Sequence, residues 1–231
     1  MMIEMIAFDA DDTLWHNENL FSMTQEKFIQ LLAPYHDADW ITERLYQTEV
    51  HNLNYFGYGI KGFTLAMIET AIELTEGRVQ GSEIQQIVEF SKEMLRAPIE
   101  LLDHVEETLI ALATAYDLMI ITKGDLFDQE TKIARSGLAD YFKHIEIVSD
   151  KTEATYAAIL TEHRIAVQGF LMVGNSLKSD ILPVIALGGR AVHIPYHVTW
   201  AYEIVADDQT VMKPYLELER IGLLPALIDT L

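Results

Sequence analysis

Five short, mainly apolar runs, each followed at once by polar residues, constrain the fold of this chain more than any other feature. They lie at residues 5–8, 118–121, 145–148, 170–173 and 190–194. Runs of this length are typical of strands that are buried on both faces, as in a parallel sheet. We therefore expect five buried strands.

Amphipathic stretches alternate with these runs. They cover residues 105–115, 129–136, 152–163 and 179–187. Gly137 and the Gly188-Gly189 pair are typical of residues that end a helix. The alternation of strands and helices predicts an α/β fold, with a Rossmann-like parallel sheet and right-handed crossovers.

One long segment interrupts the alternation directly after the first strand. Residues 17–102 contain helical patterns in place of buried strands, at 20–32, 40–50, 63–75 and 82–94. Proline and glycine residues separate these patterns, as they do between helices. We expect a core domain formed by residues 1–16 and 103–231, with a helical cap domain, residues 17–102, inserted into it.

Polar side chains follow the predicted strands where each strand ends. In open α/β sheets, ligands bind beyond the carboxyl ends of the strands, so these side chains are expected to form one site. The expected set is Asp9 and Asp11 after the first strand, Thr122 after the second, Lys151 after the third, and Asn175 and Asp180 after the fourth.

This set of side chains suits phosphoryl transfer. An aspartate can attack phosphorus and form an aspartyl-phosphate. A second carboxylic acid can protonate the leaving alkoxide and then deprotonate the hydrolytic water. Magnesium takes oxygen ligands and neutralises phosphate charge, while a hydroxyl and an ammonium can hold the phosphoryl oxygens. Taken singly, these residues are ordinary turn, cap or surface residues, and only their shared place at one edge favours a site.

The chain resembles the haloacid dehalogenase (HAD) superfamily of hydrolases over nearly its whole length, in four segments that follow the family's order. The first is Asp9-Ala10-Asp11-Asp12-Thr13-Leu14, and the second is Ile121-Thr122-Lys123-Gly124. The third is Lys151 alone, and the fourth is Val173-Gly174-Asn175-Ser176-Leu177-Lys178-Ser179-Asp180. The resemblance implies a HAD-like core with a helical cap of the phosphatase type, which agrees with the insertion inferred from pattern.

The resemblance also implies a role for each matching residue. Asp9 would be the nucleophile and a metal ligand, and Asp11 the general acid/base, with its backbone carbonyl on the metal. Thr122 and Lys151 would bind phosphate as catalytic residues. Lys123 is included in the expected phosphate-binding set, although its position also suits local support. Asn175 and Asp180 would complete the coordination of Mg²⁺.

One residue departs from the family pattern, because Asn175 stands where the family usually has an acidic residue. An amide oxygen can still bind Mg²⁺ without adding negative charge, so we expect metal binding to survive in weaker form. The sequence leaves open whether Asn175 or Asp180 contacts the metal directly.

The leading prediction is a Mg²⁺-dependent phosphohydrolase that acts on small phosphate monoesters. The first alternative is a 2-haloacid dehalogenase, which needs neither a metal nor an acid for the leaving halide, so Asp11 argues against it while Asn175 keeps it open. The second alternative is a non-catalytic binding protein with the HAD fold. An inactive relative would be expected to lack Asp9 or Asp11, and both are present.

Composition narrows the expected partners. Lysine and arginine number 16 against 36 aspartate and glutamate residues, so the formal net charge of −20 disfavours nucleic acid and anionic membranes as partners. The chain has no cysteine, which excludes thiolate chemistry. We see no signal peptide or membrane-spanning run, and we expect a cytoplasmic protein with a small phosphorylated metabolite as substrate. The oligomeric state stays open, a homodimer included.

Two aromatic segments lie outside the four motifs. Residues 51–61 combine aromatics with Gly57 and Gly59, and suit either a loop that faces the active site or an ordinary connection with buried aromatics. The second segment follows the fifth strand and contains His193, Tyr196, His197 and Trp200. We expect this second group to pack at the edge of the sheet.

Overall fold

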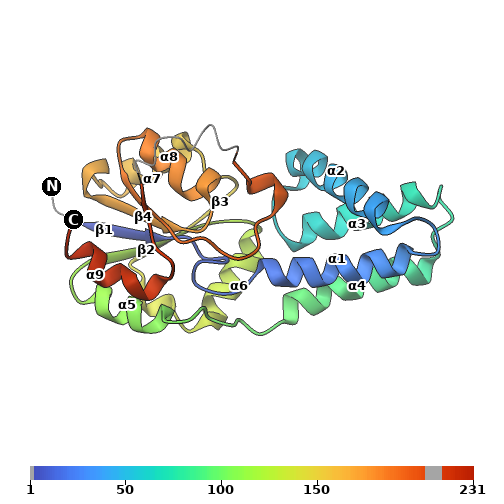
Figure 1. The fold of residues 1–231 in the computed structure, drawn as a ribbon, viewed down its shortest axis with the longest axis horizontal. Helices are drawn as coiled ribbons and strands as arrows, with labels where there is room; N and C mark the ends of the chain where they lie inside the picture. The colour runs from blue at the N-terminus through green and yellow to red at the C-terminus, as the bar shows by residue number, and fades with distance from the viewer. Residues whose placement is uncertain (1–2, 206–214) are drawn as a thin grey trace. The chain divides into compact units, whose positions relative to one another are not determined.

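The computed structural model describes residues 3–205 and 215–231. It divides into two compact units, residues 1–18 with 99–231, and residues 19–98. The sequence placed these junctions at 16/17 and 102/103. We call the first the α/β unit and the second the helical unit, and Figure 1 shows the elements of each.

The α/β unit is built on a six-stranded parallel sheet with the order β3-β2-β1-β4-β5-β6. Its strands are β1 (Met5–Phe8), β2 (Asp117–Lys123), β3 (His144–Val148), β4 (Phe170–Gly174), β5 (Arg190–His193) and β6 (Leu216–Glu217). The first strand in sequence lies in the middle of the sheet, so the residues after it lie between the ends of its two neighbours.

Helices cover both faces of the sheet. Alternate residues of each strand point to opposite faces, so β1, β2 and β4 each contribute side chains to two apolar clusters. Ile6 and Phe8 face α5 (Val105–Ala113), α6 (Leu126–Ser136) and α9 (Leu224–Ile228). Met5 and Ala7 face α7 (Glu153–Glu162) and α8 (Leu182–Ala186). Figure 1 shows these two layers on either side of the strands. The predicted α/β fold with a parallel sheet is confirmed.

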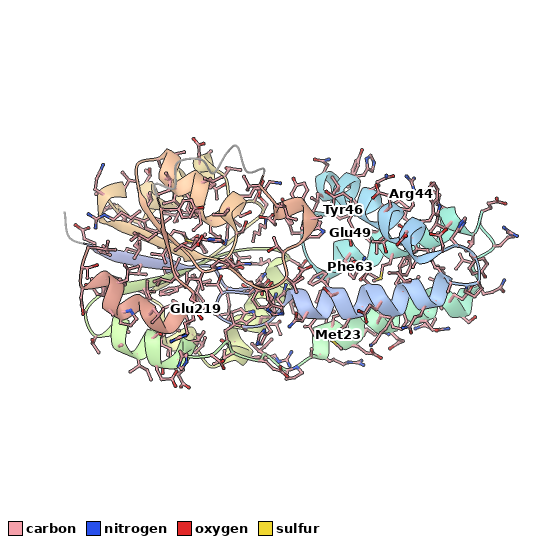
Figure 2. All side chains as sticks on the ribbon, viewed as in Figure 1. Met23, Arg44, Tyr46, Glu49, Phe63 and Glu219 are labelled. Atoms are coloured by element: carbon pink, nitrogen blue, oxygen red, sulfur yellow. The ribbon has the colours of Figure 1, made fainter. Side chains whose placement is uncertain are left out.

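The helical unit has a core of its own. Its helices are α1 (Glu18–Leu32), α2 (Ala38–Phe56), α3 (Ile60–Leu74) and α4 (Gly81–Arg96). Phe63, labelled in Figure 2, packs on Phe21 with their ring centroids 5.2 Å apart. Phe28, Ile41 and Met67 are fully buried in the same cluster. No strand lies in this segment, as expected from its helical patterns.

Three elements differ from the sequence predictions. Helix α2 runs to Phe56, because nothing breaks it before Gly57, whose φ of 68° ends the helix. Residues 51–56 are therefore helical and not part of a loop, and Tyr55 and Phe56 are exposed rather than buried. The helix expected at 179–187 divides into a π-helical turn (Leu177–Ile181) and α8. Strand β6 has only two residues, both exposed, and was not predicted.

Among the described residues, no helix has both the length and the apolar character needed to cross a bilayer. The described part of the chain beyond β5 forms a 3₁₀ turn (Ala201–Glu203), β6 and α9. This region returns along the sheet, as Figure 1 shows, and its first part lies next to the motifs considered below.

Candidate active site

The predicted polar edge forms around the end of β1. Phe8 pairs with Ile120 of β2 on one side and with Val173 of β4 on the other. The backbone N–H of Asp9 donates to the Val173 carbonyl over 2.9 Å, so the pairing continues one residue further. Asp9 is therefore fixed where the ends of three strands meet.

Lys151 joins two buried carboxylates at this edge. Its Nζ lies 2.5 Å from Asp9 Oδ1 and 2.6 Å from Asp180 Oδ1. Burial lowers the pKa of Lys151, but the charges of Asp180 and Asp9 raise it by more, so the ammonium stays protonated. Three residues that lie far apart in the sequence are thus brought into direct contact, as the edge argument predicts.

One ammonium does not balance two carboxylates, and the pKa of Asp9 reflects this. Burial raises that pKa from 3.8 to about 7, and the negative charge of Asp180 adds to the rise while Lys151 opposes it. A carboxylate must be ionised to act as a nucleophile. A further positive charge beside Asp9 would lower its pKa and keep it ionised at neutral pH.

Asn175 shares a hydrogen-bond donor with Asp9. Thr13 Oγ1 lies 3.1 Å from Asp9 Oδ2 and 3.3 Å from Asn175 Oδ1. In the described ranges no group of three or more His, Asp or Glu side chains is arranged to hold a metal ion. The oxygen atoms of Asp9, Asn175 and Asp180 are nevertheless the donor type that Mg²⁺ takes. This donor set and the raised pKa of Asp9 fit a hard cation.

The Asp11 carboxylate is held by donors of its own. It accepts hydrogen bonds from Trp15 Nε1 over 2.7 Å and from Gln129 Nε2 over 2.9 Å, and Lys132 Nζ lies 2.7 Å from both of its oxygens. Burial raises the pKa of Asp11, but Lys132 and the other donors lower it by more. The side chain is therefore an anion in this arrangement.

Sequence reasoning did not identify Gln129 or Lys132. Both lie on α6 and are three residues apart, so they share one face of that helix. Both are buried although polar, which is rare without a buried partner. A polar pair at this spacing, shortly after the second motif, is the signal that could have found them.

Thr122 lies at the end of β2 with none of its surface exposed. Its hydroxyl has no hydrogen-bond partner within the part of the chain that the structure describes. Leaving a buried hydroxyl without a partner costs about 1–3 kcal/mol. A ligand oxygen at this edge would satisfy it.

Lys123, the next residue, is paired with a residue that sequence reasoning missed. Its Nζ lies 2.5 Å from Glu203 Oε1 and 2.8 Å from Ser179 Oγ. Glu203 Oε2 accepts from Ser176 Oγ over 2.5 Å and from Ser179 Oγ over 2.6 Å. This pairing does not favour the expected role of Lys123 as a phosphate ligand.

Asp12 has a local role, as its place after the strand suggests. Its Oδ1 accepts from the backbone N–H groups of Asn17 over 2.8 Å and Glu18 over 3.0 Å. Its φ is 60°, a region that aspartate tolerates better than most residues. Asp12 therefore fixes the end of the loop that begins with Asp9.

A model of the haloacid dehalogenase-like hydrolase family matches residues 3–188. A haloacid dehalogenase-like family hydrolase from Xanthomonas campestris is 41% identical, with a TM-score of 0.88, over 99% of this chain and 91% of that one. No curated protein sequence matches the chain.

Two more distant structures share the fold. A magnesium-bound HAD hydrolase from Bacillus subtilis is 15% identical with a TM-score of 0.70, over 99% of this chain and all (100%) of that one. An L-2-haloacid dehalogenase from Xanthobacter autotrophicus is 14% identical with a TM-score of 0.68, over 99% of both chains. By its motifs, its fold and these matches, the chain belongs to the haloacid dehalogenase-like hydrolase family.

Proposed function

We propose that this hydrolase is a Mg²⁺-dependent phosphohydrolase that acts on small phosphate monoesters through an aspartyl-phosphate on Asp9. The observation that carries the proposal is the buried carboxylate of Asp9, bound to Lys151, which also binds Asp180 at the same edge of the sheet. That environment suits a nucleophile that works beside a metal ion and an anionic substrate.

In the first step, an Asp9 oxygen attacks phosphorus and the bond to the ester oxygen breaks. The Lys151 ammonium and the unpartnered Thr122 hydroxyl are suited to hold the phosphoryl oxygens, because both are donors at the same edge. A Mg²⁺ ion held by Asp9, Asn175, Asp180 and the Asp11 carbonyl would neutralise charge on the phosphate.

Asp11 is proposed as the general acid and base. To act as an acid, Asp11 must first take up a proton from solvent, which it then gives to the leaving alkoxide; in the second step the resulting carboxylate takes a proton from the water that hydrolyses the aspartyl-phosphate. Its ion pair with Lys132 stabilises the anion, which suits the base step. The acid step requires the carboxyl group to exchange that contact for the leaving group.

Dehalogenation of 2-haloacids is the alternative reaction class. It uses a nucleophilic aspartate but needs no metal and no acid for the departing halide. Asn175, an amide where the family usually has an acidic ligand, is the residue that favours it. Asp11, with three donors arranged around its carboxylate, favours the phosphatase.

The Asp9→Asn variant tests the proposal. We expect Mg²⁺-dependent release of phosphate from 4-nitrophenyl phosphate to fall at least about 1,000-fold, because the amide cannot form the covalent intermediate. The matched control is Asp39→Asn, on the exposed surface of α2, with a thermal melt to check the fold of both variants.

Undiminished phosphate release by Asp9→Asn would rule out the assigned nucleophile. Turnover of 2-haloacids by the wild type that persists in excess chelator would favour dehalogenation instead. A screen of phosphorylated metabolites with Mg²⁺, with Asp9→Asn as the blank, would then identify the substrate.

A further inference from the structure

Glu203 is a buried acid that the proposed chemistry does not use. Its side chain is 10% exposed, and it lies in the 3₁₀ turn that follows β5. One carboxylate oxygen meets Lys123 Nζ, and the other accepts from both Ser176 Oγ and Ser179 Oγ. Burial raises the pKa of Glu203, but Lys123 and the two hydroxyls lower it by more, so the group is an anion.

The two serines that Glu203 binds shape the loop that holds Asp180. Ser176 Oγ accepts from the Ser179 backbone N–H over 3.0 Å, which caps the π-helical turn. The Ser176 backbone N–H donates to Asp180 Oδ2 over 3.0 Å. Ser176 therefore links the two acids: its hydroxyl binds Glu203, and its backbone N–H binds Asp180.

The π-helical turn needs such support. A turn with hydrogen bonds from residue i to i+5 is rare, and usually occurs where function needs an unusual backbone path. Here the turn covers Leu177–Ile181 and includes Asp180, whose side chain is 1% exposed. Glu203 binds the hydroxyls at the start of this turn and within it.

Lys178 also joins the loop that holds Asp180 to the 3₁₀ turn that contains Glu203. Lys178 Nζ donates to the Tyr202 carbonyl over 2.7 Å and lies 3.3 Å from the centroid of the Tyr202 ring. Residues 194–204 also contact the segment that follows the first motif, because Tyr196 Oη lies 2.6 Å from His16 Nδ1.

We propose that Glu203 is a positioning residue, which holds the Asn175–Asp180 loop in register with Thr122 and Lys123 at the end of β2. The inference rests on the proposed function for its chemistry, because Asn175 and Asp180 are the residues expected to hold Mg²⁺. Glu203 would act through Ser176, Ser179 and Lys123, and it touches none of the proposed metal ligands.

Stability alone does not explain this network. A buried ion pair often contributes no more than apolar residues of similar volume, since both charges lose their hydration. The simpler role for Glu203 is to neutralise Lys123. The two roles differ in what they require, because positioning needs an oxygen that accepts from both serines, whereas neutralisation needs a negative charge.

The test compares Glu203→Ala and Glu203→Gln with Glu219→Gln, a matched control. Glu219, labelled in Figure 2, belongs to the same α/β unit, and its side chain is 81% exposed. Three quantities are measured for each variant: kcat/KM with 4-nitrophenyl phosphate, the Mg²⁺ dissociation constant by calorimetry, and amide hydrogen exchange over residues 175–181.

We expect Glu203→Ala to weaken Mg²⁺ binding and to lower kcat/KM by about 10- to 100-fold each, the usual effect of losing a residue that orients metal ligands. Exchange over 175–181 should become faster. Glu203→Gln should recover part of the Mg²⁺ affinity, because its amide oxygen can accept from both serines while its NH₂ group cannot accept from Lys123. Glu219→Gln should match the wild type.

Either of two results would overturn the proposal. The first is Glu203→Ala with the Mg²⁺ affinity and loop exchange of Glu219→Gln. The second is Glu203→Gln as impaired as Glu203→Ala, which would assign the residue to charge neutralisation. If Glu203→Ala does not fold, Ser179→Ala replaces it, since the Glu203–Lys123 pair remains, and unchanged Mg²⁺ affinity and exchange there would count against positioning.

The proposed function and this inference can fail separately. If the wild type releases no phosphate from any ester, the proposed function fails, while Mg²⁺ binding and exchange over 175–181 still decide the role of Glu203. If the wild type binds no Mg²⁺, amide hydrogen exchange over residues 175–181 alone decides the role of Glu203. If the wild type is an active phosphatase and Glu203→Ala changes none of the three quantities, only the inference fails.

Discussion

Gly174, the last residue of β4, shows how closely the backbone approaches the proposed metal ligands. A Cβ atom added to Gly174 would lie 2.3 Å from Asp180 Oδ2. That distance is far inside van der Waals contact, and it involves the carboxylate that Lys151 binds. The lack of a side chain at Gly174 therefore creates the space in which Asp180 lies.

The Gly174→Ala variant should lose activity because the new methyl group displaces the Asp180 carboxylate. We expect phosphatase activity and Mg²⁺ affinity to fall by at least about 10-fold, with a stability loss of about 1–3 kcal/mol from overpacking. Activity, calorimetry and urea unfolding check these outcomes. Gly81→Ala on α4 is the control, since a Cβ there meets nothing within 4 Å. Equal behaviour of the two variants would contradict the argument.

The sequence predicts some residues of the candidate site and misses others. It predicts that Asp9, Lys151 and Asp180 share one edge, because the carboxyl ends of parallel strands meet there and each residue follows a strand within a few positions. Glu203 was not predicted, because it lies in a turn whose pattern does not show which way a polar side chain points. Lys132 was not predicted either, although its spacing from Gln129 on one face of α6 is a usable signal. Their partners become visible only when the strands are placed side by side.

At the scale of elements, β3 carries a titratable cluster apart from the active site. The ring of His144 lies 4.1 Å, centroid to centroid, from that of His163, which directly follows α7, and His163 Nε2 lies 2.7 Å from Glu146 Oε1. Burial lowers the pKa of His144, and the nearby His163 and Lys143 lower it further. Protonation of His144 is thus less favourable in the folded protein than in the unfolded chain.

This cluster predicts a loss of stability in mild acid. Since the pKa of His144 is lowered from 6.5 on folding, the unfolded chain binds more protons below that pH, and the contribution of His144 is lost as pH falls through this window. His144→Gln should therefore lose less stability than the wild type between pH 7.5 and pH 5. Urea unfolding at both pH values measures this, with His104→Gln as control. Parallel losses in wild type and His144→Gln would show that another group is responsible.

The strands were more predictable than the connections between them. Strands β1 to β5 lie within two residues of the expected runs. In β1, β2 and β4 burial on both faces requires a run of apolar residues. Strand β3 lies at the edge of the sheet and has no buried residue, so the burial expected for it is not observed. Strand β6 has two exposed residues, Leu216 and Glu217, and carries no such pattern. The pattern at 179–187 predicts one ordinary helix, whereas its first three residues belong to the π-helical turn at Leu177–Ile181, because periodicity does not distinguish the two over so few residues.

At the scale of the whole molecule, the formal net charge of −20 opposes the approach of an anionic substrate. The cations that offset it at the site are few, and Lys151, Lys132 and Lys123 are each paired with a carboxylate. Attraction of a phosphate ester is therefore short-ranged, while repulsion acts over the Debye length, about 10 Å at 0.1 M salt.

Added salt should consequently raise kcat/KM for a dianionic phosphate ester. Screening weakens the long-range repulsion more than it weakens the buried contacts at the site. The measurement is kcat/KM at saturating Mg²⁺ as NaCl is raised from about 20 to about 200 mM, roughly a threefold change in the Debye length. KCl is the control for specific ion effects. A fall in kcat/KM over this range would mean that a local positive field dominates.

The entry and exit of the helical unit lie side by side within the α/β unit. Trp15 and Leu101 form an antiparallel bridge, and the Leu102 backbone N–H donates to the Leu14 carbonyl over 3.0 Å. Contacts within the α/β unit thus hold together the two points at which the chain leaves for the helical unit and returns from it. A long insertion at this point costs little more in chain entropy than a short one, since loop-closure entropy grows slowly with length. A change in the length or sequence of the inserted unit therefore need not disturb the sheet that carries Asp9.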